Sequence, residues 1–113
     1  MEQVKISTSG LQQLNKIVFS KQVYVGTVAQ GEIWIANYDG TNQTKINIAL
    51  PSGVRVQDGP NVKLSPDGKT LFFTTTNTTS DEWQIYSCNV DGTNPKQITS
   101  GAGSNYISIG GAY

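Results

Sequence analysis

The stretch IWIANYDGTN, residues 33–42, decides the fold, because its last four residues recur 52 positions later in the chain. The second copy is IYSCNVDGTN, residues 85–94. In both copies an apolar and aromatic segment precedes Asp-Gly-Thr-Asn, and a short segment with isoleucine follows it, at residues 45–48 and 96–99. Asp-Gly tolerates the positive φ that tight turns need, so each copy predicts a β-hairpin.

Two pairs of strand-like segments precede these hairpins, at residues 15–20 with 21–27 and at residues 61–65 with 69–75. In the second pair the predicted turn is Ser65-Pro66-Asp67-Gly68, where proline presets φ and glycine closes the turn. The first pair has no Pro-Asp-Gly, and we expect a tight turn there through Ser20 to Gln22. Each repeat would therefore contain four short strands.

A third strand-like start lies at residues 105–110, so the starts Asn15, Asn61 and Asn105 are spaced 46 and 44 residues apart. Four-stranded units at this period are typical of β-propeller blades. The expected organisation has five parts: a strand-like segment at 1–14, a blade at 15–48, a link at 49–60, a blade at 61–100, and a strand-like segment at 101–113 that starts a next blade or closes onto another subunit.

Several predicted strands are apolar at successive positions, at residues 23–25, 33–36 and 71–73. A sheet with one solvated face would alternate apolar and polar residues. Both faces of these sheets are therefore expected to be covered, as in a propeller where each blade packs between two neighbours. Trp34, which stands between Ile33 and Ile35, is expected in the core.

The order Ser-Pro-Asp-Gly-Lys, apolar strand, Ile-Tyr, Asn-Val-Asp-Gly-Thr-Asn and Lys-Gln-Ile-Thr, within residues 65–99, resembles the TolB-like (WD40-like) β-propeller repeat. The first repeat keeps Ile-Trp and Asp-Gly-Thr-Asn but lacks the Ser-Pro-Asp-Gly turn. The resemblance implies an all-β fold of propeller blades, two in each chain. It also implies protein–protein recognition in the cell envelope. The residues themselves do not indicate a compartment, and the resemblance suggests the bacterial periplasm or another extracytoplasmic location if a leader has been removed.

Six blades are typical of TolB-like propellers, whereas two blades alone leave two apolar sheet faces in water. We expect identical chains to associate head to tail around a closed axis, so that three chains give a six-bladed ring. Four chains with eight blades are a variant. A fragment of a longer propeller is the alternative to assembly.

Composition excludes several classes of function. The chain has no histidine and a single cysteine, so a histidine-dependent catalytic triad, a His-ligated zinc site and an intramolecular disulfide are excluded. The net charge is zero, which offers no electrostatic basis for binding nucleic acid. Only 14% of the residues are charged, and Thr, Ser, Asn and Gln make up 40 of 113. The sequence contains neither an apolar run long enough to span a membrane nor, in its first ten residues, the apolar core of a signal peptide.

Residues with catalytic side chains are few, and each has a structural interpretation. Asp39, Asp67 and Asp91 lie in Asp-Gly turns, where the carboxylate bonds to the local backbone. Cys88 lies within a predicted strand and is expected to be a small buried hydrophobe. We therefore expect no catalytic residue, no cofactor and no metal.

Surface recognition remains, through the two irregular stretches at 49–60 and 77–83. Their candidate partner-binding residues are Arg55, Gln57, Asp58, Asp81, Glu82 and Trp83. The expected function is a non-enzymatic scaffold that binds a protein or peptide through these loops and a central channel. The alternatives are a lectin, since polar loops with a tryptophan suit sugar hydroxyls, and an engineered chain or fragment whose only property is assembly.

Overall fold

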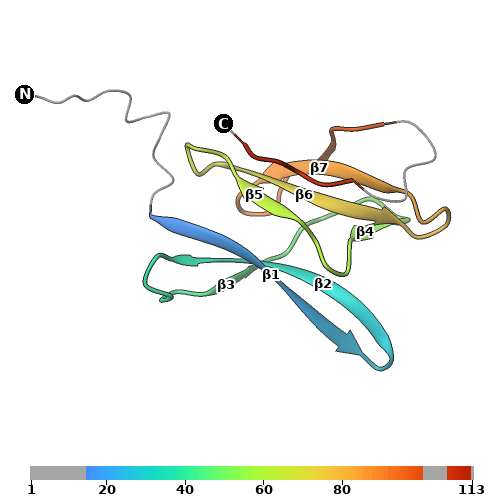
Figure 1. Cartoon of the computed structure of the whole chain (residues 1–113), viewed down its shortest axis with the longest axis horizontal. Helices are drawn as coiled ribbons and strands as arrows, with labels where there is room; N and C mark the ends of the chain where they lie inside the picture. The colour runs from blue at the N-terminus through green and yellow to red at the C-terminus, as the bar shows by residue number, and fades with distance from the viewer. Residues whose placement is uncertain (1–14, 101–106, 113) are drawn as a thin grey trace, which may run out of the picture.

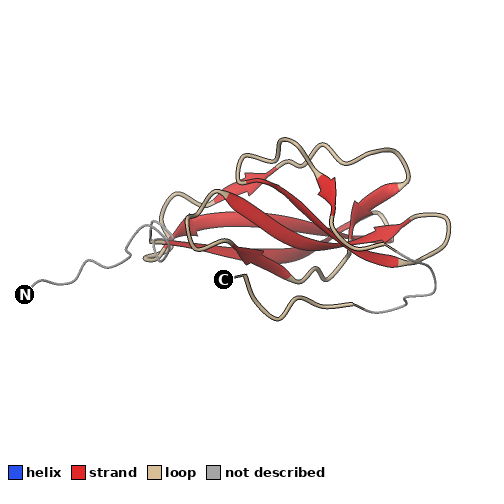
Figure 2. Ribbon diagram, turned by 90° about the horizontal axis from the view of Figure 1, so that it is seen from above, coloured by secondary structure: helices blue, strands red, loops and turns tan. Residues whose placement is uncertain are grey.

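The computed structural model describes residues 15–100 and 107–112, and every regular element in these two ranges is a β-strand (Figures 1 and 2). The strands form two separate sheets whose neighbouring strands all run antiparallel. The expectation of an all-β protein is confirmed.

The N-terminal sheet contains β1 (Lys16–Val25), β2 (Val28–Asn37) and β3 (Thr44–Ile46), in that order. β1 and β2 form a long hairpin that turns at Gly26, whose φ is +65°. Glycine adopts this conformation without the clash that a Cβ would cause, so the chain reverses there.

The prediction of a turn through Ser20 to Gln22 is wrong. β1 runs straight through these residues, and Lys21 lies opposite Glu32 of β2. Neither glycine nor proline interrupts β1, whereas Gly26 follows a few residues later and takes the turn. The first repeat consequently contributes three strands, and not four, to the described structure.

The C-terminal sheet contains β4 (Val54–Val56), β5 (Val62–Leu64), β6 (Thr70–Asn77), β7 (Trp83–Asn89) and β8 (Lys96–Gln97). β7 pairs with one edge of β6, and β8 pairs with β7. On its other edge β6 pairs with β5 along its first half and with β4 along its second half. β4 and β5 therefore act as one strand interrupted by residues 57–61.

β4 lies inside the link at 49–60, which we expected to be irregular. The backbone N–H of Gln57 donates to the carbonyl of Thr74, and the N–H of Asn61 donates to the hydroxyl of the same threonine. Thr74 of β6 thus forms hydrogen bonds with both ends of the segment that separates β4 from β5. Gln57-Asp58-Gly59-Pro60 suggests a loop, but the valines that flank it at 54, 56 and 62 belong to strands.

The turns that close the two Asp-Gly hairpins have the same hydrogen bonds. Gly40 N–H donates to the carbonyl of Asn37 at 2.9 Å, and the corresponding bond from Gly92 to Asn89 is 2.8 Å. In both copies the residue directly after the glycine, Thr41 or Thr93, donates its hydroxyl to the turn aspartate at 2.6 Å. The sequence repeat is therefore a structural repeat.

The predicted turn at Ser65-Pro66-Asp67-Gly68 is confirmed. Gly68 N–H donates to the carbonyl of Ser65 at 2.9 Å, and Gly68 has a φ of +75°. The carboxylate of Asp67 accepts hydrogen bonds from the hydroxyl of Ser65 and the N–H of Lys69. These bonds join β5 to β6.

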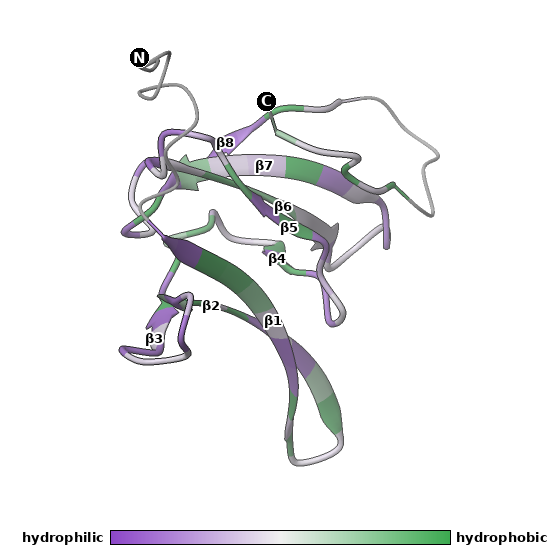
Figure 3. Ribbon diagram, turned by 60° about the vertical axis from the view of Figure 1, so that its left-hand side comes forward, coloured by the Kyte–Doolittle hydropathy of each residue, from purple (hydrophilic) through white to green (hydrophobic). Residues whose placement is uncertain are grey.

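The core lies between the two sheets, which stack on each other (Figures 1 and 3). We call the face of each sheet that points into this core its inner face and the opposite one its outer face. The inner faces supply the buried apolar residues Ile33, Ile46, Leu64, Leu71, Phe73, Tyr86 and Cys88. Strand alternation then places the residues between them on the outer faces.

The third strand-like start lies partly outside the described residues, and residues 107–112 are not a strand. The N–H of Ile109 donates to the side-chain oxygen of Asn61 at 2.9 Å, next to the start of β5. Gly110 to Ala112 border an open groove together with the start of β1 and with β5. The segment therefore runs along the edge where β1 and β5 lie near each other. The expected strand-like segment at 1–14 lies outside the described residues.

Candidate functional site

Two of the candidate contact residues lie in one row across the outer face of the C-terminal sheet. Arg55 of β4 is opposite Thr76 of β6, and Thr76 is opposite Trp83 of β7. Paired residues on neighbouring strands point to the same face, so the arginine and the tryptophan flank the threonine. Trp83 is half-buried and begins β7, while Arg55 is exposed. The row brings a cation and an aromatic ring, both favoured contact residues, to the end of one sheet.

The loop that joins β6 to β7 is held beside this row. The N–H and the hydroxyl of Thr78 both donate to the carbonyl of Gly53, in the turn before β4. Within the loop, the side-chain oxygen of Asn77 accepts from the N–H groups of Thr79 and Ser80. The two irregular stretches that the sequence singled out therefore meet at one end of the sheet.

Asp81 and Glu82 lie in the same loop. Asp81 is exposed and has a φ of +62°, and its N–H donates to the carbonyl of Asn77. The carbonyl of Glu82 accepts from the N–H of Asn77, and its side chain borders a hollow on the inner side of the sheet with Gln84 and Gln97. Four of the six candidate residues, Arg55, Asp81, Glu82 and Trp83, thus belong to one end of the C-terminal sheet.

Gln57 and Asp58 belong elsewhere. Gln57 is buried, and its amide group donates to the carboxylate of Asp58 while accepting from the N–H of Gly59. Its backbone carbonyl lies against Gly31 of β2, where an added Cβ would stand 2.0 Å from the oxygen. The Gln57 side chain therefore holds the interruption between β4 and β5 in place and is only 8% exposed.

The three turn aspartates have the structural role that the sequence predicts. The hydroxyl of Thr41 holds the pKa of Asp39 below its usual value, and Thr93 does the same for the pKa of Asp91. The hydroxyl of Ser65 is the main cause of the lowered pKa of Asp67. Each carboxylate is engaged by its own turn. Among the residues that the structure describes, no three His, Cys, Asp or Glu side chains gather where a metal ion could be held.

Cys88 is buried on the inner face of β7, as predicted. Burial is the main cause that raises the pKa of its thiol to about 11, and the negative charge of Asp91 adds to it. Since the thiolate is the reactive form of cysteine, this side chain is held in its unreactive state.

Sequence reasoning missed an aromatic cluster on the outer face of the N-terminal sheet. Trp34 was expected in the core, and this is wrong: it is half-buried on the outer face, stacked on Phe19 with ring centroids 6.4 Å apart. The amine of Lys21 lies 3.7 Å from the centre of the Trp34 ring, and the ring N–H donates to Glu32. Alternation along β2 shows from the sequence only that Ile33 and Trp34 lie on opposite faces of the sheet, and not which of the two faces meets the other sheet.

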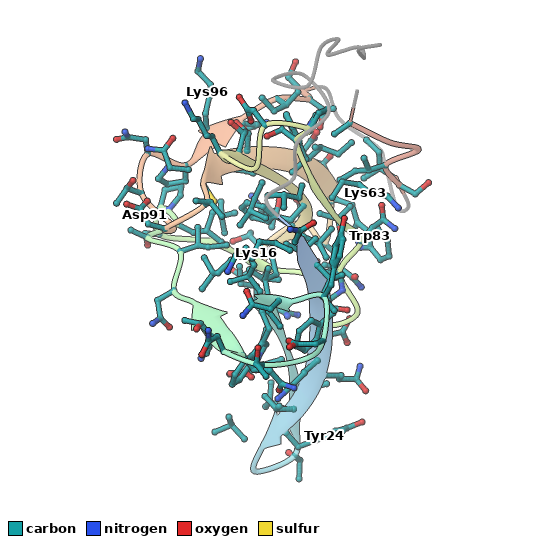
Figure 4. All side chains as sticks on the ribbon, turned by 90° about the vertical axis from the view of Figure 1, so that its left-hand side faces the viewer. Lys16, Tyr24, Lys63, Trp83, Asp91 and Lys96 are labelled. Carbon is teal, nitrogen blue, oxygen red and sulfur yellow. The ribbon has the colours of Figure 1, made fainter. Side chains whose placement is uncertain are left out.

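Further exposed apolar residues extend beyond this cluster: Ile17, Val25 and Val28 on the outer face of the N-terminal sheet, Tyr24 near the hairpin tip, and Ile98 next to β8. Figure 3 shows apolar colour at both ends of β1, and Figure 4 shows Tyr24 at the far end of the hairpin. Exposed apolar residues are ordinary when scattered, whereas a contiguous patch is typical of an interaction surface.

Comparison with known proteins identifies no relative: the chain matches no known protein family, no curated protein and no solved structure. In the part of the chain that the structure describes, no helix could cross a membrane.

Proposed function

We propose that this chain is a non-enzymatic binding scaffold that assembles with copies of itself and recognises a protein or peptide partner. The observation that carries the proposal is the apolar outer face of the N-terminal sheet. Ile17 is 42% exposed there, beside the half-buried Phe19 and Trp34, and Val28 is 55% exposed further along the same face, near the tip of the hairpin. Covering such a face contributes roughly 25 cal/mol for each Å² of apolar surface removed from water, and this term favours association.

The surroundings of the potentially reactive side chains favour a binding role over a catalytic one. The turn aspartates are engaged in hydrogen bonds with their own turns, and the Cys88 thiol is buried with a raised pKa. These side chains serve the fold.

The proposed assembly is a ring of three chains with six propeller-like blades, which the resemblance to TolB-like repeats suggests. Two stacked sheets per chain with the same hairpin in each are consistent with it, because stacked repeats can continue from one chain to the next. The row of Arg55, Thr76 and Trp83, with the adjoining loop, is the proposed contact surface for the partner.

The mass of the native protein tests self-assembly. Light scattering on the purified chain at about 100 µM should give three times the 12.2 kDa chain mass. A monomer at that concentration would refute assembly. A defined multiple other than three would keep assembly and reject the three-chain ring.

Peptide selection tests recognition. Peptides selected from a random displayed library on the wild-type protein should lose binding to the double variant Arg55→Ala and Trp83→Ala. They should retain binding to Gln57→Ala, in which the altered side chain is buried. Equal binding to all three proteins would reject this surface.

A further inference from the structure

The two sheets can be compared residue by residue, because the repeat gives each position of the N-terminal sheet an equivalent in the C-terminal sheet. β2 matches β7 with an offset of 52 residues, so that Trp34 corresponds to Tyr86. The pairing of β1 with β2 and of β6 with β7 then matches Phe19 to Phe73, since these are the partners of Trp34 and Tyr86. The offset between β1 and β6 is thus 54 residues.

The equivalent aromatic pairs have the same ring separation in opposite surroundings, although the outer rings are stacked at 22° and the core rings are tilted at 33°. Phe73 and Tyr86 lie in the core with ring centroids 6.4 Å apart, and Phe19 and Trp34 lie on an outer face with centroids also 6.4 Å apart. Phe73 is completely buried, covered by the inner face of the N-terminal sheet. The outer pair has the ring separation of the buried pair, but neither sheet of the described chain covers it.

The correspondence extends to further apolar positions of the face. The outer-face residues of the N-terminal sheet that match buried core residues are Ile17 with Leu71, Phe19 with Phe73, Trp34 with Tyr86, and Ala36 with Cys88. Ile17 is 42% exposed whereas Leu71 is not exposed at all. The outer face of the N-terminal sheet is therefore a second copy of the inner face of the C-terminal sheet.

The reverse correspondence holds on the other side of the molecule. Ile33 and Ile46 form the inner face of the N-terminal sheet, and they match Ile85 and Ile98 on the outer face of the C-terminal sheet. Ile46 is 7% exposed and Ile98 is 50% exposed. The outer face of the C-terminal sheet is consequently a second copy of the face that covers the core aromatic pair.

We propose that the outer face of the N-terminal sheet binds the outer face of the C-terminal sheet of a second copy of this chain, head to tail, in the manner of the contact between the two sheets within one chain. On the C-terminal sheet the contact centres on Ile85 and Ile98, and the row of Arg55, Thr76 and Trp83 at the end of the same face is left for the partner. One chain cannot join its own two outer faces, because they lie on opposite sides of the stacked sheets. Each copy therefore offers one face of each kind, and successive contacts close into a ring where the rotation permits. The inference rests on the proposed self-assembly and assigns its two surfaces.

The equivalent glycines Gly92 and Gly40 also differ in whether they are covered. Gly92, in the turn between β7 and β8, lies against the backbone of Asn47, which follows β3. Its equivalent Gly40 has nothing within 4 Å of where a Cβ would stand. In the proposed contact Gly40 would meet Thr99 of the second copy, which is the equivalent of Asn47.

Charged residues occupy one side of the proposed contact. Lys21, Glu32 and Lys45 correspond to Thr75, Gln84 and Gln97, which are neutral. Glu32 and Lys45 form an ion pair 3.3 Å apart, so these two charges are already compensated. Lys21 lies over Trp34 on a long flexible side chain that can move its amine into water when the second copy docks.

Complementation between two variants tests the inference. Ile17→Glu places a charge on one outer face and Ile98→Glu on the other, at positions that are exposed in the separate chain. Each variant alone should associate at least about a hundred-fold more weakly than the wild type. Because each retains one intact face of the opposite kind, an equimolar mixture should form a 1:1 complex with twice the 12.2 kDa chain mass.

The control is Tyr24→Glu, which adds the same charge at an exposed aromatic residue outside the proposed contact. Its equivalent by the 54-residue offset, Thr78, is exposed, so this variant should assemble like the wild type. Far-ultraviolet circular dichroism tests whether each variant is folded. If a glutamate variant is not, Ile17→Ser and Ile98→Ser replace the pair.

The outcomes separate the two proposals. A monomeric wild type refutes self-assembly and this inference together. A wild type that assembles while Ile17→Glu and Ile98→Glu assemble equally well refutes only the assignment of the faces. If one variant still dimerises alone, or if the mixture of folded variants stays monomeric, the contact is not head to tail and the inference is overturned.

Discussion

Gly92 lies so close to the backbone carbonyl of Asn47 that a Cβ built on the glycine would stand 2.0 Å from the oxygen. Gly92 belongs to the turn between β7 and β8, and Asn47 follows β3, so the contact joins the two sheets at one end. No real Cβ tolerates such a distance, and the atom it meets belongs to the backbone. The residue at 92 must therefore be glycine for a reason beyond its φ of +90°.

Replacing Gly92 by alanine should cost more stability than the same change at Gly40. Both glycines have positive φ in equivalent turns, so each substitution carries a backbone cost of about 1–2 kcal/mol. Only Gly92→Ala also pushes against Asn47, which should add about 1–3 kcal/mol. Urea unfolding of both variants in the Ile17→Glu background measures the separate chain. Equal free energies of unfolding would contradict the contact.

The aromatic pairs supply a second matched comparison. Phe73→Ala removes a completely buried ring and should lower the free energy of unfolding by about 3–5 kcal/mol. Phe19→Ala removes the equivalent ring from an outer face, and in the Ile17→Glu background it should cost less than half as much. Chemical unfolding followed by circular dichroism compares them. A Phe19→Ala cost equal to that of Phe73→Ala would mean that Phe19 is already covered within one chain.

Local chemistry made the hairpins predictable from the sequence. Asp39 and Asp91 engage the threonine two residues later, and Ser65 to Gly68 close a turn through bonds among neighbours in the chain. Such bonds depend on residues within the turn itself, so the sequence specifies them. For the same reason, Ser20 to Gln22 could have been assigned to a continuous β1, because this segment contains neither the glycine nor the proline that a tight turn favours.

The pairing of strands that are distant in the sequence was harder to predict. β4 is three residues long and is a strand only because β6 extends far enough to pair with it. The grouping of Arg55 with Trp83 follows from that pairing, and so does the separation of Gln57 from both. Whether Trp34 lies on the inner or the outer face depends on which side of the N-terminal sheet meets the other sheet. Both sides of β2 carry apolar residues, so the sequence does not specify that side.

The Cys88 thiol should react slowly in the folded protein. Its pKa is raised from 9.0 to about 11, so at pH 8.5 the thiolate fraction is about a hundred-fold smaller than in the unfolded chain. Because the folded state favours the neutral thiol, the associated stabilisation is present below pH 9 and is lost as the pH rises through 11. Labelling with a thiol reagent at pH 8.5, with and without denaturant, measures the ratio of rates. Equal rates would show that the thiol is accessible and ionises normally.

The hydrogen bond from Thr93 should control the acidity of Asp91. Its hydroxyl is the main cause of the lowered pKa, so Thr93→Val should raise the pKa of Asp91 toward its usual value, whereas Thr93→Ser should keep it low. A carboxyl whose pKa is lower in the folded state stabilises the protein above its unfolded pKa, which is about 3.8 for Asp91, and this contribution is lost as the pH falls through the folded pKa. Thr93→Val should therefore flatten the loss of stability in acid more than Thr93→Ser does. The carboxyl carbon shift of Asp91 in a pH titration by nuclear magnetic resonance measures the pKa directly, and identical midpoints in the two variants would assign the low pKa to another group.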